Sequence, residues 1–302
     1  HGIRDVERSR GLGDVYKRQS YNGGRLHHQP PARGQAQGTP PQKITMPLSN
    51  RSLRRGCIWF LFCLAAIPIP AQVLINEIHY RPANESVSEE FVEIWNFKDE
   101  PVSLDSWQLN AGILFVFGKI TLPPDSGLVI AADVARFAEL HPGVKNVVGN
   151  WRGQLSNNGE TIRLVDANGA TADKVRYSTQ GDWSRRVTGP LRGGHRGWTW
   201  HAIHDGGGHS LELMQPGLFN NHGQNWHSSL AKGGTAGRAN STKTTNIPPL
   251  ILDVIHTPAV PQSADSVTVT ARVIDESPDG TEAQLHYRLD GKANFHSLPM
   301  AQ

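Results

Sequence analysis

Cysteine is nearly absent from this sequence of 302 residues. The two cysteines, Cys57 and Cys63, lie in one apolar run, and residues 73–302 contain none. A disulfide framework and a cysteine-based metal site are therefore excluded for residues 73–302.

Motifs typical of common enzyme classes are also missing. The sequence has no GxSxG, no HExxH, no P-loop and no GxGxxG after a strand pattern. Sustained heptads are absent, which excludes a long coiled coil. We therefore expect no catalytic residue, no enzymatic activity and no cofactor.

Positive charge is concentrated at the N-terminal end. The first 72 residues hold 11 Lys+Arg against 3 Asp+Glu, so subtraction from the totals of 30 and 27 leaves 19 basic and 24 acidic residues in 73–302. The part expected to fold is thus mildly acidic, and the overall basic balance does not predict a nucleic-acid partner.

Two N-terminal segments precede the strand patterns. Residues 1–45 are rich in Gly, Pro and Gln without periodicity, which is typical of a non-native or disordered leader; a basic nucleic-acid-binding tail is the alternative, although no aromatic side chains for base stacking accompany the charge. Residues 46–71 combine three arginines, an apolar run of about 13 residues and small residues before Gln72, the pattern of a secretory signal peptide. An uncleaved anchor is the alternative, although the run is shorter than the roughly 20 residues of a spanning helix. We expect an exported, extracellular or cell-surface protein that meets a membrane only through this signal.

Residues 73–80 and 90–96 predict two neighbouring buried strands. Both are short and rich in β-branched and aromatic residues, and they carry apolar side chains on both faces. Their centres are nevertheless polar, with Asn76 and Glu77 in the first and Glu93 and Asn96 in the second.

Three explanations of this polar centre remain open at the sequence level. Like charges opposite each other on adjacent strands are destabilising, so Glu77 and Glu93 need partners. We favour a structural polar network of Asn76, Glu77, Glu93 and Asn96 with no metal. A calcium site is the second explanation, although no oxygen-rich loop accompanies it. A catalytic carboxylate pair is the third, and would need a cleft.

The strand pattern continues with short turns through residues 104–177, interrupted by one helix expected over 133–143. In order, the chain contains Asn-Glu, EFVEIWN, LDSWQL, LPPDSGLVIA, LSNNGETIRLVD and VRY, then GHSLEL. This succession resembles the lamin-tail domain over 73–177, with a final strand at 208–213.

The resemblance implies an all-β fold, an immunoglobulin-like β-sandwich, expected here over 73–214. It also implies a non-catalytic module, which in bacteria occurs in exported multi-domain surface proteins and serves adhesion, binding or structural spacing. The alternative is an accessory N-terminal region of a larger enzyme, for example one with a spore-coat-kinase-like domain beyond Gln302.

Residues 178–207 form an irregular insertion rich in tryptophan, arginine and histidine. Trp and Arg are common in interface hot spots, so this insertion is the candidate binding region, for an extracellular glycan or protein. The alternative is that the tryptophans cover one end of the sandwich and the arginines are solvated. The histidines lack a zinc-ligand spacing. The candidate binding residues are Trp183, Arg185, Arg186, Trp198, Trp200 and His201.

Two segments follow the sandwich. Residues 215–247 are rich in Gly, Asn and Ser and predict a polar linker, tacked back by Trp226. Residues 248–302 alternate apolar and polar side chains in strand-like runs and resemble the first half of an immunoglobulin- or fibronectin-III-like domain, which we expect to be truncated.

Overall fold

The computed structural model describes residues 42–45, 73–192, 195–262, 265–277, 281–288 and 294–301. The chain divides into two compact units, Ile69–Ile247 and the combination of His1–Pro68 with Pro248–Gln302. The predicted signal peptide and all but the last four residues of the predicted leader lie outside the described residues.

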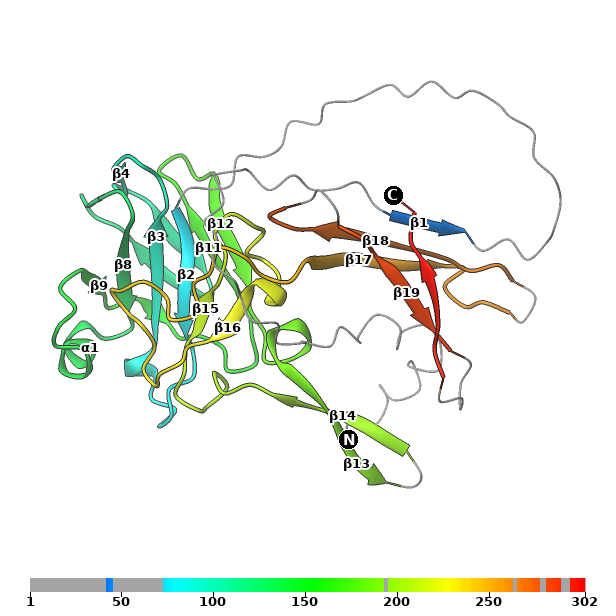
Figure 1. The fold of residues 1–302 in the computed structure, drawn as a ribbon. Helices are drawn as coiled ribbons and strands as arrows, with labels where there is room; N and C mark the ends of the chain where they lie inside the picture. Colours follow the sequence, from blue (N-terminus) through cyan, green and yellow to red (C-terminus); the bar gives the residue numbers. More distant parts are fainter. Residues whose placement is uncertain are drawn as a thin grey trace, which may run out of the picture. The chain divides into compact units, whose positions relative to one another are not determined.

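The larger unit contains a six-stranded sheet with the order β16-β15-β2-β3-β8-β9 (Figure 1). All its pairs are antiparallel except β8 with β9. The predicted neighbouring strands form β2 and β3 at its centre. The strands are β2 (Val73–His79), β3 (Phe91–Asn96), β8 (Ser126–Ala131), β9 (Val147–Gly149), β15 (Leu211–Leu213) and β16 (Trp226–Ser228).

A five-stranded antiparallel sheet with the order β10-β6-β5-β11-β12 forms the second layer. Its strands are β5 (Gln108–Ala111), β6 (Ile113–Val116), β10 (Arg152–Gly153), β11 (Thr161–Val165) and β12 (Thr171–Arg176). The short strands β4 (Val102–Ser103) and β7 (Thr121–Leu122) pair with each other.

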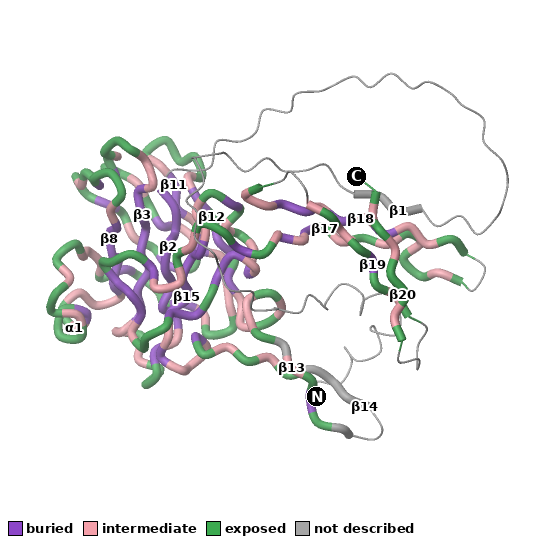
Figure 2. Tube along the Cα trace, in the orientation of Figure 1, coloured by how far each residue is buried: buried purple, intermediate pink, exposed green. Residues whose placement is uncertain are grey.

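The main hydrophobic core lies between these two sheets. Ile75, Ile78 and Ile94 of the larger sheet pack in one cluster with Ile113 and Leu164 of the smaller sheet, and all five are fully buried. Figure 2 shows the same concentration of buried residues along β2, β3, β8 and β11. This arrangement is the predicted all-β, immunoglobulin-like β-sandwich.

The other face of the six-stranded sheet is also covered. Phe91, Val129 and Ala131 pack there against Phe137 and Ala236. Phe137 belongs to helix α1 (Val134–Leu140), whose N-cap Asp133 accepts a hydrogen bond from Arg136 N, as the predicted helix start requires. A sheet covered on both faces explains why β2 and β3 are apolar on both faces.

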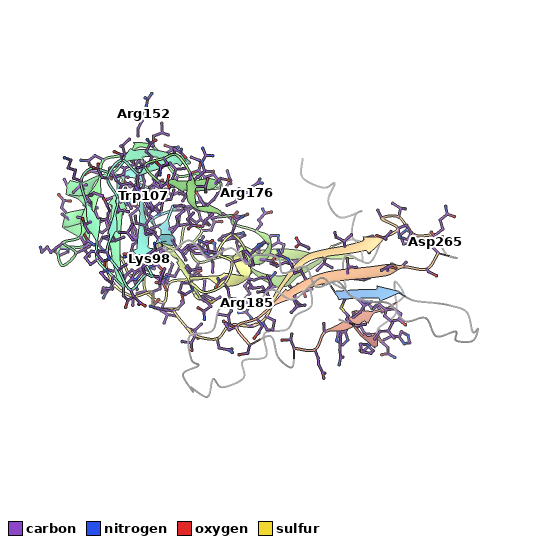
Figure 3. All side chains as sticks on the ribbon, turned by 90° about the horizontal axis from the view of Figure 1, so that it is seen from above. Lys98, Trp107, Arg152, Arg176, Arg185 and Asp265 are labelled. Atoms are coloured by element: carbon purple, nitrogen blue, oxygen red, sulfur yellow. The ribbon has the colours of Figure 1, made fainter. Side chains whose placement is uncertain are left out.

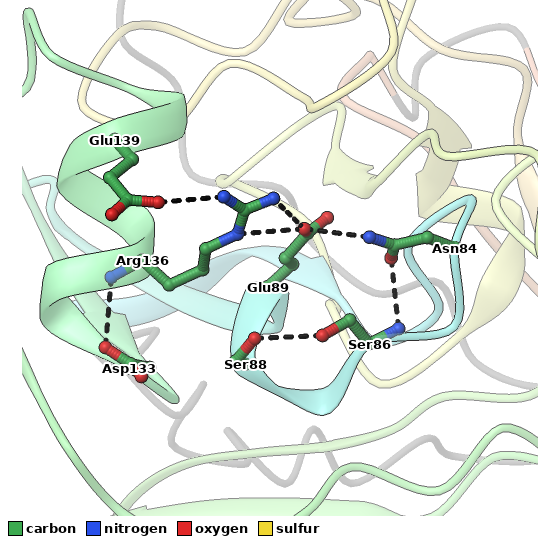
Figure 4. A network of polar contacts seen from close by, with 7 residues as sticks. All are labelled: Asn84, Ser86, Ser88, Glu89, Asp133, Arg136 and Glu139. Carbon is green, nitrogen blue, oxygen red and sulfur yellow. Dashed lines mark hydrogen bonds and ion pairs between the residues drawn. The ribbon is translucent and has the colours of Figure 1, made fainter.

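The β2–β3 connection is fastened to α1 by an ion pair. Arg136 donates from Nε and Nη2 to Glu89 Oε1, at 3.0 and 2.6 Å. Asn84 donates to the same oxygen, and Glu139 accepts from Arg136 Nη1 (Figure 4). Glu89 lies in the 3-10 turn η3 (Val87–Glu89). The connection therefore helps to hold the helix against the sheet.

Residues 215–247, predicted as a linker, belong to the larger compact unit. They contain η5 (Gly223–Asn225) and β16, and Trp226 is buried with its Nε1 donating to Asn220 O at 2.6 Å. The small polar residues led to the prediction of a linker, and composition does not reveal that this segment packs on the sheet.

The second unit contains a sheet of order β1-β18-β17 and a β19–β20 hairpin. The strands are β1 (Gln42–Thr45), β17 (Leu250–Thr257), β18 (Thr268–Ile274), β19 (Gln284–Tyr287) and β20 (His296–Pro299). Val269, Ala271 and Val273 are buried, as the alternation predicts. Gln42–Thr45, expected to be disordered, instead pairs with the edge of β18, where it supplies backbone hydrogen-bond partners.

Candidate functional site: a row of buried glutamates

Three glutamates form a row across three adjacent strands of the six-stranded sheet. Glu77 of β2 is the register partner of Glu93 on β3 and of Glu212 on β15. All three side chains have no solvent exposure. The predicted juxtaposition of Glu77 with Glu93 is present, and Glu212 extends the row by one strand.

Residues 231–244, which we call the covering segment, lie over this row. The segment supplies three backbone N–H donors to the three carboxylates. Thr235 N donates to Glu77 Oε1 at 2.7 Å, and Gly237 N donates to Glu93 Oε2 at 2.6 Å. Thr242 N donates to Glu212 Oε2 at 2.9 Å. Each glutamate thus binds one amide of the same segment.

Hydroxyl groups complete the contacts of the row. Ser210 Oγ donates to Glu77 Oε1 at 2.5 Å. Ser241 Oγ and Thr242 Oγ1 both lie within 2.9 Å of Glu212 Oε2. No Lys or Arg among the residues that the structure describes forms an ion pair with these carboxylates. The negative charge is therefore compensated by neutral donors.

A glycine allows the covering segment to approach this closely. Gly234 has a φ of +74°, and a Cβ built there would lie 2.0 Å from Glu77 Oε1 and 2.6 Å from Ser210 Oγ. An L side chain at this position would suffer both the left-handed backbone and the collision. The site therefore requires glycine at position 234.

Burial shifts the protonation of two members of the row. Burial raises the pKa of Glu77 well above its ordinary value of 4.5, and the neighbouring Glu93 adds to the effect. Burial also raises the pKa of Glu93 to about 7, although the Gly237 N–H and the Asn76 amide oppose the shift. The protein thus favours a proton on the row near neutral pH.

The Thr235 hydroxyl lies between two members of the row. Its Oγ1 lies 2.7 Å from Glu212 Oε1 and 3.3 Å from Glu77 Oε2. A hydroxyl has one proton to donate. The shorter contact is to Glu212, so the Thr235 hydroxyl donates its proton to Glu212. A protonated Glu77 can then donate to Thr235 Oγ1, which satisfies both contacts.

Asn76 connects the covering segment to the sheet. It occupies an irregularity in the β2–β3 register, and its Nδ2 donates to Glu93 Oε1 and to Asn240 Oδ1, both at 2.9 Å. Asn240 returns a bond to Asn76 Oδ1 at 3.0 Å and one to Leu213 O at 2.9 Å. This reciprocal amide pair fixes the end of the segment.

Asn96, predicted to join the same network, makes different contacts. Its Nδ2 donates to the carbonyl oxygens of Glu100, Leu122 and Pro123, and its Oδ1 accepts from Lys98 N. These bonds organise the turns beyond the end of β3. Asn96 is therefore structural but separate from the glutamates.

Another buried carboxylate, outside the row, joins the two sheets. Asp173 of β12 accepts from Ile75 N of β2 at 2.7 Å and from Asn220 Nδ2 at 2.8 Å. Burial raises its pKa to about 6. The role of Asp173 was not predicted from the sequence.

The row is built for structural hydrogen bonding. Its carboxylate oxygens face N–H and O–H groups, whose positive ends would repel a calcium ion at the same place. Among the residues described, no group of three or more His, Cys, Asp or Glu side chains is placed to hold a metal ion. A catalytic pair would need access to substrate, whereas Glu77 and Glu93 are fully buried.

The candidate binding residues lie on or beside a hairpin of β13 (Arg185–Arg192) and β14 (His195–His201), which extends away from the sandwich (Figure 1). Arg185 is opposite His201, and both are exposed. Arg186 is opposite the half-buried Trp200, and Thr188 is opposite Trp198. The side chains of Arg186 and Trp198 fall outside the described part.

Trp183 differs from the other candidates. It lies in η4 (Gly181–Trp183), packs against the main core, and its ring centroid is 5.8 Å from that of Trp226. The predicted alternative, a tryptophan that covers the sandwich, describes Trp183. The structure therefore divides the insertion into a core-packed base and a projecting hairpin.

The larger unit is by its fold an immunoglobulin-like β-sandwich module with a structural carboxylate row. Residues 68–179 match the family model of the Lamin Tail Domain. No curated protein matches the chain. Glu212 and the covering segment lie beyond the matched residues but within the same compact unit.

Glu212 and the covering segment were not predicted as parts of the site from the sequence. The GHSLEL run predicted the last strand without revealing that its glutamate continues the row. The sequence did contain an indication of this contact, because small residues and hydrogen-bond donors are interspersed in GGTAGRANST, 233–242. Such a segment can approach buried carboxylates and supply N–H and O–H groups.

Proposed function

We propose that residues 69–247 form a non-catalytic module of a bacterial exported or cell-surface multi-domain protein, and that the module serves adhesion, binding or structural spacing. The observation that carries this proposal is the saturation of the glutamate row by the covering segment. The side chains best suited to acid–base chemistry are thereby committed to holding the fold.

The β13–β14 hairpin is the contact element in this proposal. Arg185 and His201 are exposed at its base, and paired strands that project from a sandwich present side chains without disturbing the core. An extracellular glycan or protein suits this mixture of basic and aromatic residues.

Export is supported by the pattern of residues 46–71, with basic residues, an apolar run and small residues in the order of a signal peptide. Within the described parts of the chain, no helix has the length and apolar character needed to cross a membrane.

The test is binding of the full chain to an array of neutral glycans, with Arg185→Ala/His201→Ala as the hairpin variant. We expect the wild-type chain to bind, and the hairpin variant to bind more weakly. The control variant Lys232→Ala, in the covering segment, should bind like the wild type. Lys232 is exposed, so its loss leaves the fold intact. Equal binding by all three proteins would refute the role of the hairpin.

A further inference from the structure

The outward face of the five-stranded sheet carries four basic residues and no carboxylate. In β12, Lys174 and Arg176 are exposed, whereas Asp173 and Val175 point inward and are buried. Arg163 of β11 is half-buried between the buried Ile162 and Leu164, and Arg152 of β10 is exposed. Figure 3 shows Arg152 and Arg176 extending away from the sandwich.

Five outward positions, one from each strand, form a line across the sheet, and three of them are basic. Lys174 is the register partner of Arg163, whose Nε donates to Asn110 Oδ1 of β5 at 2.8 Å. Asn110 is opposite Leu114 of β6, and Leu114 is opposite Arg152. Because neighbouring strands are about 4.8 Å apart, the line is about 19 Å long.

This face has no internal counter-charge. Arg81, Arg136 and Arg272 form ion pairs with acids, but none of the four cations of the face does so within the described residues. The acids of the flanking turns are engaged elsewhere, since Asp166 accepts from two backbone N–H groups and Glu160 accepts from Ser156 N.

The cations also oppose each other. Lys174 and Arg163 are directly opposite on adjacent strands, an arrangement that is destabilising when both carry the same charge. An anion placed over the line would remove this repulsion. The face therefore has an electrostatic reason to bind an extended polyanion.

We propose that this face binds an extended acidic polysaccharide that lies across the strands. Guanidinium groups bind carboxylates in a bidentate geometry, and three of the four cations are arginines. Leu114 and Val116, 52% and 63% exposed, offer apolar contact to sugar rings beside the charges. The choice of a polysaccharide rests on the proposed export.

Nucleic acid fits the face less well. Proteins that bind single strands without sequence preference stack bases on aromatic side chains, and none occurs at the five positions of the line. Base readout in duplex DNA uses an element that enters a groove, which a flat sheet does not provide.

The test measures binding of the full chain to polygalacturonate at low salt, with neutral dextran and duplex DNA as competing probes. The variants are Arg152→Gln, Arg163→Gln, Lys174→Gln and their triple combination, and Lys232→Gln is the control. Each single substitution is expected to weaken binding about threefold, and the triple variant about thirtyfold. Binding of the wild type should weaken as salt is raised.

Lys232→Gln and the hairpin variant Arg185→Ala/His201→Ala should retain wild-type affinity for polygalacturonate. Circular dichroism must show that the triple variant is folded. The proposal is overturned if dextran competes as well as polygalacturonate, if the triple variant binds like the wild type, or if duplex DNA is bound more tightly. Loss of affinity in the hairpin variant alone would assign the site to the hairpin and overturn the sheet-face proposal.

Discussion

Replacement of Gly234 by alanine should destabilise the larger unit strongly. An alanine with left-handed φ costs about 1 kcal/mol. The new Cβ, at 2.0 Å from Glu77 Oε1, also forces the carboxylate away from the Thr235 N–H and the Ser210 hydroxyl. Loss of buried hydrogen bonds costs about 1–3 kcal/mol, so the free energy of unfolding should fall by about 3 kcal/mol in total.

Gly169→Ala is the matched control. Gly169 also has a left-handed φ, +81°, but no atom lies within 4 Å of the Cβ position. Its cost should therefore be only the backbone contribution, about 1 kcal/mol. Urea unfolding followed by tryptophan fluorescence reports on the larger unit, because every tryptophan except Trp59 belongs to it. Equal losses in the two variants would refute the close approach of the covering segment to Glu77.

Three further predictions concern the glutamate row and the export signal. Glu93→Gln should be less stable than the wild type by a margin that shrinks as pH rises from about 4.5 to 7. Glu93 has a pKa of about 7 in the folded protein, above the ordinary value of 4.5, so its contribution to the free energy of unfolding is complete below pH 4.5. As pH rises from about 4.5 to 7, this contribution falls by up to about 3 kcal/mol. A margin that grows with pH, measured by urea unfolding, would contradict this prediction. Calcium should leave the wild-type melting temperature unchanged, since a ligand of the native state alone would raise it, and a rise that chelator and Glu93→Gln both abolish would establish a calcium site. A chain expressed from Met46 should be cleaved near Ala71 and recovered outside the cytoplasm, and N-terminal sequencing that finds residues 57–69 in the secreted product would disprove the signal peptide.

Several of the strands could be predicted because each depends on a local pattern. Alternation placed Val269, Ala271 and Val273 on a buried face, and apolar residues on both faces of β3 predicted a covered central strand. The resemblance to the lamin-tail domain at 73–177 agrees with the matched range of 68–179.

The pairing of Glu77 with Glu93 was predictable for the same reason, since neighbouring strands place their polar centres together. Glu212 is distant in sequence, and a three-residue strand gives little periodicity from which to infer its partner. Its place in the row depends on tertiary pairing that no local pattern specifies.

The covering segment was misjudged as a linker because its composition is that of an exposed loop. Gly, Ser, Thr and Asn favour turns in any setting, and whether such a turn packs depends on what lies beneath it. Here buried carboxylates lie beneath it, and Thr235, Ser241 and Thr242 are donors to them. The same residues in a true linker would be solvated.

The most direct test of the covering segment is native-state amide hydrogen exchange in the full chain at neutral pH. The N–H groups of Thr235, Gly237 and Thr242 donate to Glu77, Glu93 and Glu212. The account predicts that these three amides are protected nearly as strongly as the amides of Val92 and Ile94 in β3, because they open only when the sheet is uncovered. Exchange of all three at the rate of an unstructured linker, while β3 stays protected, would contradict it.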